Sequence, residues 1–159
     1  ETPGTSIDNS LLSKVERSVF NAIVPKKAVV AKKVNLTKDT CLLFGSVACI
    51  ELLSKEKTQA YVYVSDKVEV KVHKSIVGDN SKYIANIFQK GSLKPSSEKL
   101  KSIKDFDVYE FQITEDGGRD IGILGLGWIN FKGNKQSFRV CVPKGVYVYT
   151  TRSKIKNAF

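Results

Sequence analysis

The sequence predicts a mainly β domain of the α+β class, in which antiparallel strands are accompanied by two short helices. Apolar and polar residues alternate over several runs between positions 29 and 151, turn residues separate these runs, and only two stretches have helical spacing. A length of 159 residues suits one domain, and 42% apolar with 26% charged residues excludes the disordered and low-complexity classes.

Two segments have the periodicity of amphipathic helices, 10–23 and 81–91. In the first, apolar residues recur at Leu11, Val15, Val19 and Ile23. Ser10 precedes it as an N-cap, and Pro25 ends it because the residue before proline is disfavoured in a helix. In the second, the apolar stripe consists of Tyr83, Ile84, Ile87 and Phe88. Gly91 is placed to end that helix in a left-handed conformation.

Six segments have the composition and alternation of strands: 29–36, 41–53, 60–74, 106–114, 121–131 and 137–151. Within 60–74 five valines share one parity, at 62, 64, 68, 70 and 72. This pattern predicts one buried face and leaves Tyr61 and Tyr63 on the wetter side. Trp128, in the fifth segment, is expected in the core, with stacking on RNA as the alternative.

An internal repeat connects the two halves of the chain. Residues 43–52 align with 123–132 at an offset of 80, and residues 62–74 align with 140–152 at an offset of 78. Two matches in the same order favour a duplicated β unit, with chance similarity between strands as the alternative. The alignment equates Gly45 with Gly125 and predicts that Val70 and Val148 hold matching buried positions.

The charge is large and unevenly distributed. The formal net charge is +10; residues 105–120 hold six acids and one base, whereas residues 121–159 hold seven bases and no acid. One-signed stretches attract polyanions, which favours nucleic acid first and anionic lipid second. An alternative explanation is base composition of the genome, because lysine outnumbers arginine 22 to 4.

Other composition signals narrow the class of protein. No apolar run reaches the roughly 18 to 20 residues of a membrane span. The three cysteines, Cys41, Cys49 and Cys141, are an odd number without a C-x-x-C pair, which favours a reducing compartment over a disulfide framework. Their spacing to His73 is not that of a zinc site. The chain starts at Glu1 and has no methionine, so we expect it to be part of a longer protein.

The search for catalytic and nucleotide motifs is negative. No G-x-x-x-x-G-K-[ST] loop occurs, and Asn134-Lys135 continues without the acid that completes a guanine-reading N-K-x-D motif. Gly125 and Gly127 lack the third glycine of a dinucleotide fingerprint. His73 is the single histidine, so a nucleophile with a histidine base has little support. We therefore expect no catalytic residue in this chain.

The last strand segment carries the predicted RNA site. Val140, Val142, Val146 and Val148 share one parity, which places Arg139, Tyr147 and Tyr149 on the opposite face. Basic residues nearby complete a set of aromatic and cationic side chains suited to single-stranded or looped RNA: Lys132, Lys144, Arg152 and Lys154. The alternative is that the two tyrosines pack beneath a helix.

Several segments together resemble the C-terminal half of the YqeH-like circularly permuted GTPases, over roughly residues 10 to 155. They are GLGWINF (125–131) followed by VCVPKGVYVYTTR (140–152), preceded by VPKK (24–27), FGSVACIEL (44–52) and YVSDKVEVKVHK (63–74). The resemblance implies a β-rich C-terminal domain likened to the RNA-binding TRAP fold. It also implies a parent GTPase that assists assembly of the small ribosomal subunit.

PGTSID at 3–8 is similar to switch I of that family, P-G-T-T-x-D. The resemblance places the hydroxyl that meets Mg²⁺ and the γ-phosphate at Ser6, with Thr5 beside it as a second GTP contact. The family's D-T-P-G loop is missing after Asp8, either because it is deleted or because the sequence joins two stretches across a gap. This chain alone is therefore expected to be inactive, and GTP and Mg²⁺ belong to the parent.

The resulting interpretation divides the chain into three parts: a switch I remnant at 1–8, a connecting helix at 9–27 and a C-terminal β domain at 28–159. We expect the β domain to contact small-subunit ribosomal RNA, assembly intermediates and its own GTPase domain. The alternative is a protein-interaction module that docks the GTPase domain or an assembly partner without touching RNA. The resemblance implies the mitochondrial matrix or a plastid, with the bacterial cytoplasm as the alternative.

Overall fold

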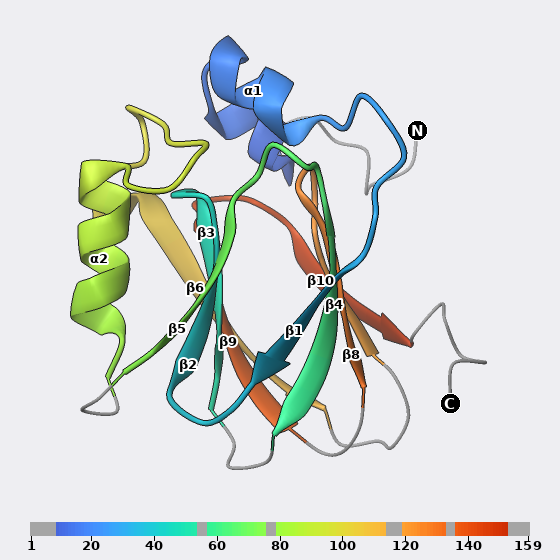
Figure 1. The fold of residues 1–159 in the computed structure, drawn as a ribbon. Coiled ribbons are helices and arrows are strands. Elements are labelled where there is room, and N and C mark those ends of the chain that lie inside the picture. The colour runs from blue at the N-terminus through green and yellow to red at the C-terminus, as the bar shows by residue number, and fades with distance from the viewer. Residues whose placement is uncertain (1–8, 54–56, 76–78, 114–118, 133–135, 153–159) are drawn as a thin grey trace.

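A computed structural model describes residues 9–53, 57–75, 79–113, 119–132 and 136–152. It confirms the predicted class, because ten strands form two antiparallel five-stranded sheets (Figure 1). The strands are β1 (Lys32–Leu36), β2 (Thr40–Phe44), β3 (Ala48–Leu52), β4 (Thr58–Val64), β5 (Val70–Lys74), β6 (Phe106–Ile113), β7 (Arg119–Ile123), β8 (Gly127–Lys132), β9 (Gln136–Pro143) and β10 (Val148–Arg152). No described helix is long and apolar enough to cross a membrane.

The two sheets enclose one hydrophobic core. Sheet A has the order β1-β4-β8-β7-β10, and sheet B has the order β5-β2-β3-β9-β6. Alternate residues of each strand turn inward, so that Val62 and Ile129 of sheet A and Ile50 and Val140 of sheet B are buried. The predicted parity of the valines in β4 is therefore confirmed.

The strand orders reveal a pseudo-twofold arrangement. Reversing the order of sheet B gives β6-β9-β3-β2-β5, which differs from sheet A only by five in each strand number. Each sheet therefore combines two strands of one repeat with three strands of the other. This exchange confirms the predicted duplication and explains why neither repeat forms a sheet of its own.

The strand pairing corrects the alignment of the repeats by one residue. Phe44 pairs with Ala48 around the β2–β3 turn and Ile123 pairs with Gly127 around the β7–β8 turn, which makes the offset 79 in these strands. Gly45 is thus the first residue of its turn, whereas Gly125 is the second of its own. Both have positive φ angles, +53° and +90°, which explains why glycine occurs in each turn.

The predicted equivalence of Val70 and Val148 is correct, but their predicted burial is not. Val70 pairs with Phe44 and Val148 pairs with Ile123, at the same places in the two repeats. Both side chains are only half-buried against the core, since β5 and β10 are edge strands. An edge strand has a neighbour on one side only, which leaves its side chains more accessible.

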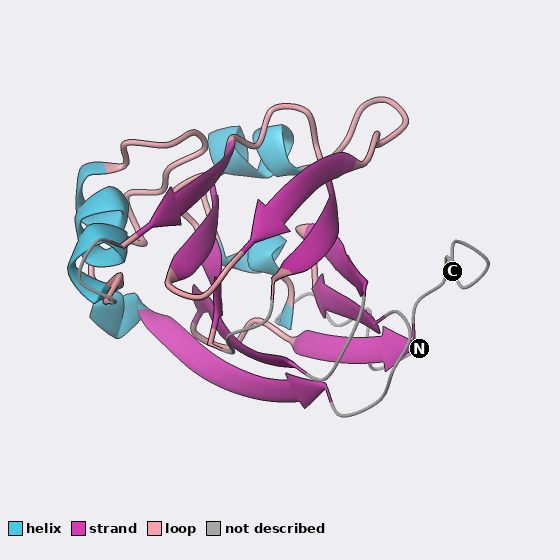
Figure 2. Cartoon of the chain, turned by 60° about the horizontal axis from the view of Figure 1, so that its bottom comes forward, coloured by secondary structure: helices cyan, strands magenta, loops and turns pink. Residues whose placement is uncertain are grey.

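The two α-helices lie at the periphery of the strands, one at the top and one at the left of Figure 1, and Figure 2 shows the helical segments in cyan from another side. α2 (Ser81–Lys90) agrees with the prediction and ends at Gly91, whose φ is +62°. The predicted helix at 10–23 is instead divided into a 3-10 turn, Leu11–Lys14, and α1 (Arg17–Ile23). Ser10 caps the 3-10 turn, while Glu16 is extended and its carboxylate binds the segment around Ser97. That tertiary contact accounts for the break.

Candidate nucleic-acid interface

A row of aromatic side chains crosses the outer face of sheet A. Register aligns Tyr63 of β4, Trp128 of β8, Gly122 of β7 and Tyr149 of β10 directly across the four strands. The Tyr63 and Trp128 rings are stacked, with centroids 4.8 Å apart and planes 11° apart. Tyr149 fills the space above Gly122, since a Cβ built on that glycine would lie 2.1 Å from the tyrosine ring. We call Tyr63, Trp128 and Tyr149 the aromatic row.

Tyr147 extends the aromatic row at the start of β10. Its ring stacks on that of Tyr149, with centroids 5.6 Å apart, and its side chain is exposed. Trp128 is 38% exposed. Partial burial, with a smaller contribution from the Asp120 carboxylate, raises the pKa of Tyr63 above its ordinary value. The Tyr63 hydroxyl therefore remains protonated at neutral pH and is available as a hydrogen-bond donor.

A second row, of mostly polar side chains, lies beside the aromatic row and is shifted by two residues along each strand. It consists of Lys33, Tyr61, Asn130 and Asp120, aligned across β1, β4, β8 and β7. Asn130 Nδ2 donates a hydrogen bond of 2.8 Å to Asp120 Oδ1, and both side chains are buried. The Asn130–Asp120 pair thus joins the neighbouring strands β8 and β7 beside the aromatic row.

Two lysines border these rows. Lys33 is exposed on β1, and Lys132 at the end of β8 places its Nζ 5.2 Å from the centroid of the Tyr61 ring. A cation over an aromatic face is attracted by the ring quadrupole, which holds Lys132 beside the rows. The only acid among the described residues of this face that point outward is Asp120, which is buried and hydrogen-bonded to Asn130.

The equivalent row of sheet B has a different chemistry. The repeats equate Tyr63, Trp128, Gly122 and Tyr149 with Cys141, Cys49, Leu43 and Lys71, which are again aligned across the strands. α2 packs on that face, where Tyr83 stacks on His73 and Phe88 stacks on Phe106. Cys49 and Cys141 are buried, and their small side chains leave room for α2. Sheet A carries the larger rings of Tyr63 and Trp128 at the same positions, and α2 does not cover them.

The structure brings together only part of the predicted RNA site. Lys132, Tyr147 and Tyr149 lie on the outer side of sheet A, and the alternative that the tyrosines pack beneath a helix is not what the structure has. Lys144 is exposed in the turn between β9 and β10. The backbone of Arg152 ends β10, and Lys154, Thr5 and Ser6 lie outside the described residues.

Arg139 contradicts the prediction of one shared face. Lys144 was expected in a turn, with the residues on both sides of it sharing one face, but at Lys144-Gly145 the chain crosses from sheet B to sheet A. Arg139 therefore projects from sheet B, with its guanidinium 3.7 Å from Glu51 and 3.4 Å from Glu110. Alternation defines a face only within one sheet, and it does not detect a crossing between sheets.

Sequence reasoning did not assemble three aromatic members of this face. Trp128 was expected in the core, with stacking on RNA as the alternative, and the core placement was wrong. Tyr61 and Tyr63 were placed on the wetter side without a role. The available signal was their parity, which is opposite to that of Val62 in β4 and Ile129 in β8. Their alignment with Tyr149 depends on which strands become neighbours, and this information is not local.

A flat aromatic row with flanking lysines is suited to one kind of ligand. Bases of single-stranded nucleic acid stack on exposed rings, amide and hydroxyl groups contact base edges, and lysines neutralise phosphates. Within the described residues, no group of three or more His, Cys, Asp and Glu side chains is placed to hold a metal ion.

Comparison with known proteins connects this face to a family. The model of the family described as "YqeH-like, C-terminal" matches residues 57–154, well over half of the chain. The chain belongs to the YqeH-like family. The matched residues include Tyr63, Trp128 and Tyr149, so the whole aromatic row lies in the part that the family model covers.

A curated relative extends the similarity over nearly the whole YqeH-like chain. The "Uncharacterized protein YqeH" of Bacillus subtilis (strain 168) is 23% identical over 155 residues, which are 98% of this chain and 42% of that protein. The chain therefore spans less than half the length of the relative that it matches.

Proposed function

We propose that this chain is the RNA- and ribosome-contacting C-terminal part of a GTPase that assists assembly of the small ribosomal subunit. The observation that carries the proposal is the aromatic row on sheet A, in a chain whose formal net charge is +10. Membership of the YqeH-like family supports the GTPase context. The proposed ligand is single-stranded or looped small-subunit ribosomal RNA, bound by stacking on Trp128 and Tyr149.

The choice of RNA over a docked protein helix rests on the comparison of the two outer faces. A helix covers small side chains on sheet B, where Cys49 and Cys141 lie beneath α2. The same positions of sheet A hold Trp128 and Tyr63, whose stacked rings occupy the space that a closely packed helix would need. Flat rings accept bases of any sequence, because every base has a π-face.

Titration of a labelled single-stranded fragment of small-subunit ribosomal RNA tests the proposal. Replacing Trp128 by Ala removes a stacking surface, and the expected loss of binding free energy is about 1 to 3 kcal/mol. The salt dependence should stay as it is, because Trp128 carries no charge. Lys132→Glu should weaken binding and also reduce the salt slope. Fluorescence anisotropy over a salt series measures both effects.

Phe20 provides a matched control. It is an aromatic side chain on α1 with the same exposure as Trp128, 38%, but it is not on sheet A. Phe20→Ala should leave RNA binding unchanged. If the Trp128→Ala and Tyr149→Ala variants bind the RNA as tightly as the unmutated chain does, the aromatic row is not an RNA site. The alternative, a docking module without RNA contact, then takes the place of this proposal.

The remaining parts of the proposal concern the longer parent protein. We propose that the parent binds GTP and Mg²⁺, with Ser6 as the switch ligand of the metal and Thr5 beside it. The proposed partners are assembly intermediates of the small subunit and the parent's own GTPase domain. The proposed compartment is the mitochondrial matrix or a plastid, with the bacterial cytoplasm as the alternative.

A further inference from the structure

We propose that the free edge of β6 docks an extended, basic polypeptide segment, which adds a strand to sheet B. This surface is separate from the aromatic row, and the inference does not depend on RNA binding. Four features of the edge carry it: the unpaired backbone, the residues that protect the other edges, an apolar cavity beside Val108, and the charge of the strand.

Among the strands that the structure describes, β6 ends the order of sheet B and, at eight residues, is longer than each of the other three edge strands, which have five. A terminal strand presents a row of backbone N–H and C=O groups to solvent, and proteins commonly protect such edges with charged side chains, especially lysine. Two of the other edges carry lysines: Lys32 and Lys33 in β1, and Lys71 and Lys74 in β5. β6, with the sequence FDVYEFQI, has none.

Apolar side chains are exposed along the same edge. Val108 is 52% exposed and belongs to the side of β6 that faces α2. Tyr109, on the opposite side of the strand, and Ile103, just before it, are also exposed. A strand added to β6 would bury all three, and burial of apolar area stabilises such a complex.

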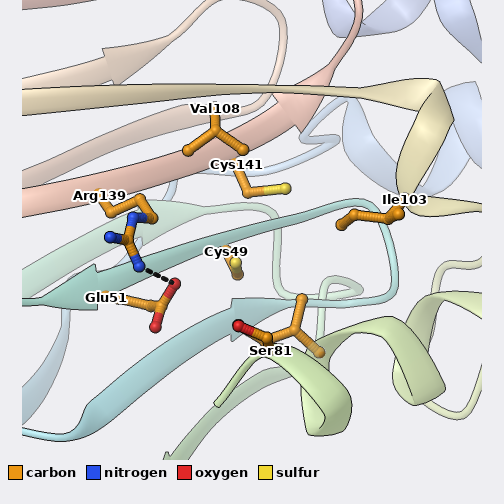
Figure 3. Close-up of a pocket in the computed structure, with 8 residues that line it drawn as sticks. Cys49, Glu51, Ser81, Ile103, Val108, Arg139 and Cys141 are labelled. Carbon is orange, nitrogen blue, oxygen red and sulfur yellow. Dashed lines mark ion pairs between the residues drawn. The ribbon is translucent and has the colours of Figure 1, made fainter. Parts of the chain in front are cut away.

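A cavity opens beside Val108 (Figure 3). It has a volume of about 180 Å³ and lies between α2 and sheet B, with Ile84, Ile103, Val108, Cys49 and Cys141 as its apolar lining. The Glu51–Arg139 ion pair closes one side. A cavity of about 150 Å³ accommodates benzene, so this one is large enough for one apolar side chain of a docked segment. In strand addition, backbone hydrogen bonds give affinity and pockets for alternate side chains give specificity.

Charge identifies the occupant as basic. Three acids, Asp105, Asp107 and Glu110, lie in β6 or directly before it, in a chain of net charge +10. Two of the acids are in β6: Asp107, which accepts a hydrogen bond from the backbone N–H of Gly145, and Glu110, which pairs with Arg139 but keeps a side chain that is 63% exposed. RNA would be repelled here, and two β6 edges of separate copies would oppose each other's acids. A lysine-rich segment is complementary.

Peptide binding to the 159-residue chain tests this inference. The probe is a fluorescein-labelled nine-residue peptide of alternating lysine and valine, followed by fluorescence anisotropy. The unmutated 159-residue chain should bind this peptide, and the affinity should fall as salt is added. Val108→Lys places a cation at the edge and beside the cavity, and the expected loss of affinity is roughly tenfold or more. Asp107→Asn with Glu110→Gln should reduce affinity at low salt and have little effect at high salt.

Val72→Lys is the matched control, because Val72 is a 39% exposed valine on β5, the other edge of sheet B. The Val72→Lys variant should bind the peptide as tightly as the unmutated 159-residue chain does. Thermal melts of both lysine variants check that they are folded. Three results would overturn the inference: no binding by the parent, equal binding by Val108→Lys and Val72→Lys, or equal binding of a peptide N-methylated at alternate amides. A concentration-dependent dimer that Val108→Lys abolishes would instead identify a second copy as the occupant.

Discussion

Trp128 and Cys49 occupy equivalent positions in the two repeats, and their side chains give the two sheet faces different surroundings. Cys49 is small and buried beneath α2, and its interaction with the Cys141 thiol, together with burial, raises its pKa well above the ordinary value. Trp128 stacks on Tyr63 and remains partly exposed. The same position of the two repeats thus belongs to a covered face in sheet B and to an open aromatic face in sheet A.

Gly122 positions the ring of Tyr149 by having no side chain. A Cβ at this position would lie 2.1 Å from the ring, and the clashing atoms are at the end of a side chain that can rotate away. We therefore expect Gly122→Ala to displace Tyr149 from the aromatic row and to weaken RNA binding several-fold. The free energy of unfolding should change by less than about 1 kcal/mol, because the backbone is not forced to move.

RNA titration and urea unfolding of the Gly122→Ala variant separate these two effects. Gly127→Ala is the contrasting variant. The φ of Gly127 is +153°, and a Cβ at this position would lie 2.1 Å from the backbone carbonyl oxygen of Tyr63. That change should destabilise the fold clearly. Unchanged RNA affinity in a folded Gly122→Ala variant would show that the position of the Tyr149 ring is unimportant for binding.

At the scale of elements, the contact between Glu16 and the segment before β6 joins the N-terminal part of the chain to the domain. The Ser97 hydroxyl and the Glu98 backbone N–H both donate to the Glu16 carboxylate, the latter over 3.0 Å. The Ser97 hydrogen bond is the main reason that the pKa of Glu16 lies below its ordinary value of 4.5. The ionised form is therefore favoured by folding.

This contact predicts a dependence of stability on pH. A carboxyl whose pKa is lowered in the folded state contributes stability above its unfolded pKa, and that contribution is lost as the pH falls through the lowered folded value. Glu16→Gln should thus cost about 1 kcal/mol at pH 7, a small value because the site is partly exposed, and progressively less in acid. Urea unfolding at pH 7 and at points below pH 4.5 measures the difference.

Glu98→Gln is the control for this prediction. The Glu98 side chain is exposed and lies 3.9 Å from Lys101, a surface pair from which little stability is expected. A Glu16→Gln variant that loses as much stability with acid as the parent chain does would show that Glu16 is not the titrating group.

At the scale of the whole molecule, the exchange of strands between the repeats makes the fold one cooperative unit. β1 and β4 lie in the sheet built mainly from the second repeat, and β6 and β9 lie in the sheet built mainly from the first. The rings of Phe131 and Phe138, tilted by 35° with centroids 4.1 Å apart, join sheet A to sheet B. The two binding surfaces that we propose belong to different sheets. A basic, aromatic surface and an acidic edge can therefore act on different partners at once.

The chain as a whole is expected not to bind GTP by itself. Its sequence contains no P-loop and no complete N-K-x-D motif, so only Thr5 and Ser6 would remain of the nucleotide-binding machinery. Titration with a fluorescent GTP analogue should show no measurable affinity for the 159 residues, whereas the longer parent should bind in the presence of Mg²⁺. Micromolar binding by this chain would contradict our interpretation of its role.

The sequence by itself determined the class of the fold, α2, the duplication and the uneven charge. These features depend on residues that are close in sequence. Alternation places Val62 and Tyr63 on opposite faces of a strand, and Gly91 ends a helix. The net charge of a segment is the sum over its residues, whatever the fold. The sequence did not predict the break in the helix at Glu16. There the carboxylate binds Ser97, 81 residues away, and this contact overrides the helical spacing of the apolar residues.

The tertiary structure alone decided which side chains share a surface. Arg139 and Tyr149 have the same parity in one run of sequence, yet the turn at Lys144-Gly145 sends them to different sheets. Tyr63, Trp128 and Tyr149 are distant in sequence and become one row through the register of four strands. Strand neighbours are chosen by the burial of a whole core, and no local pattern in the chain encodes that choice.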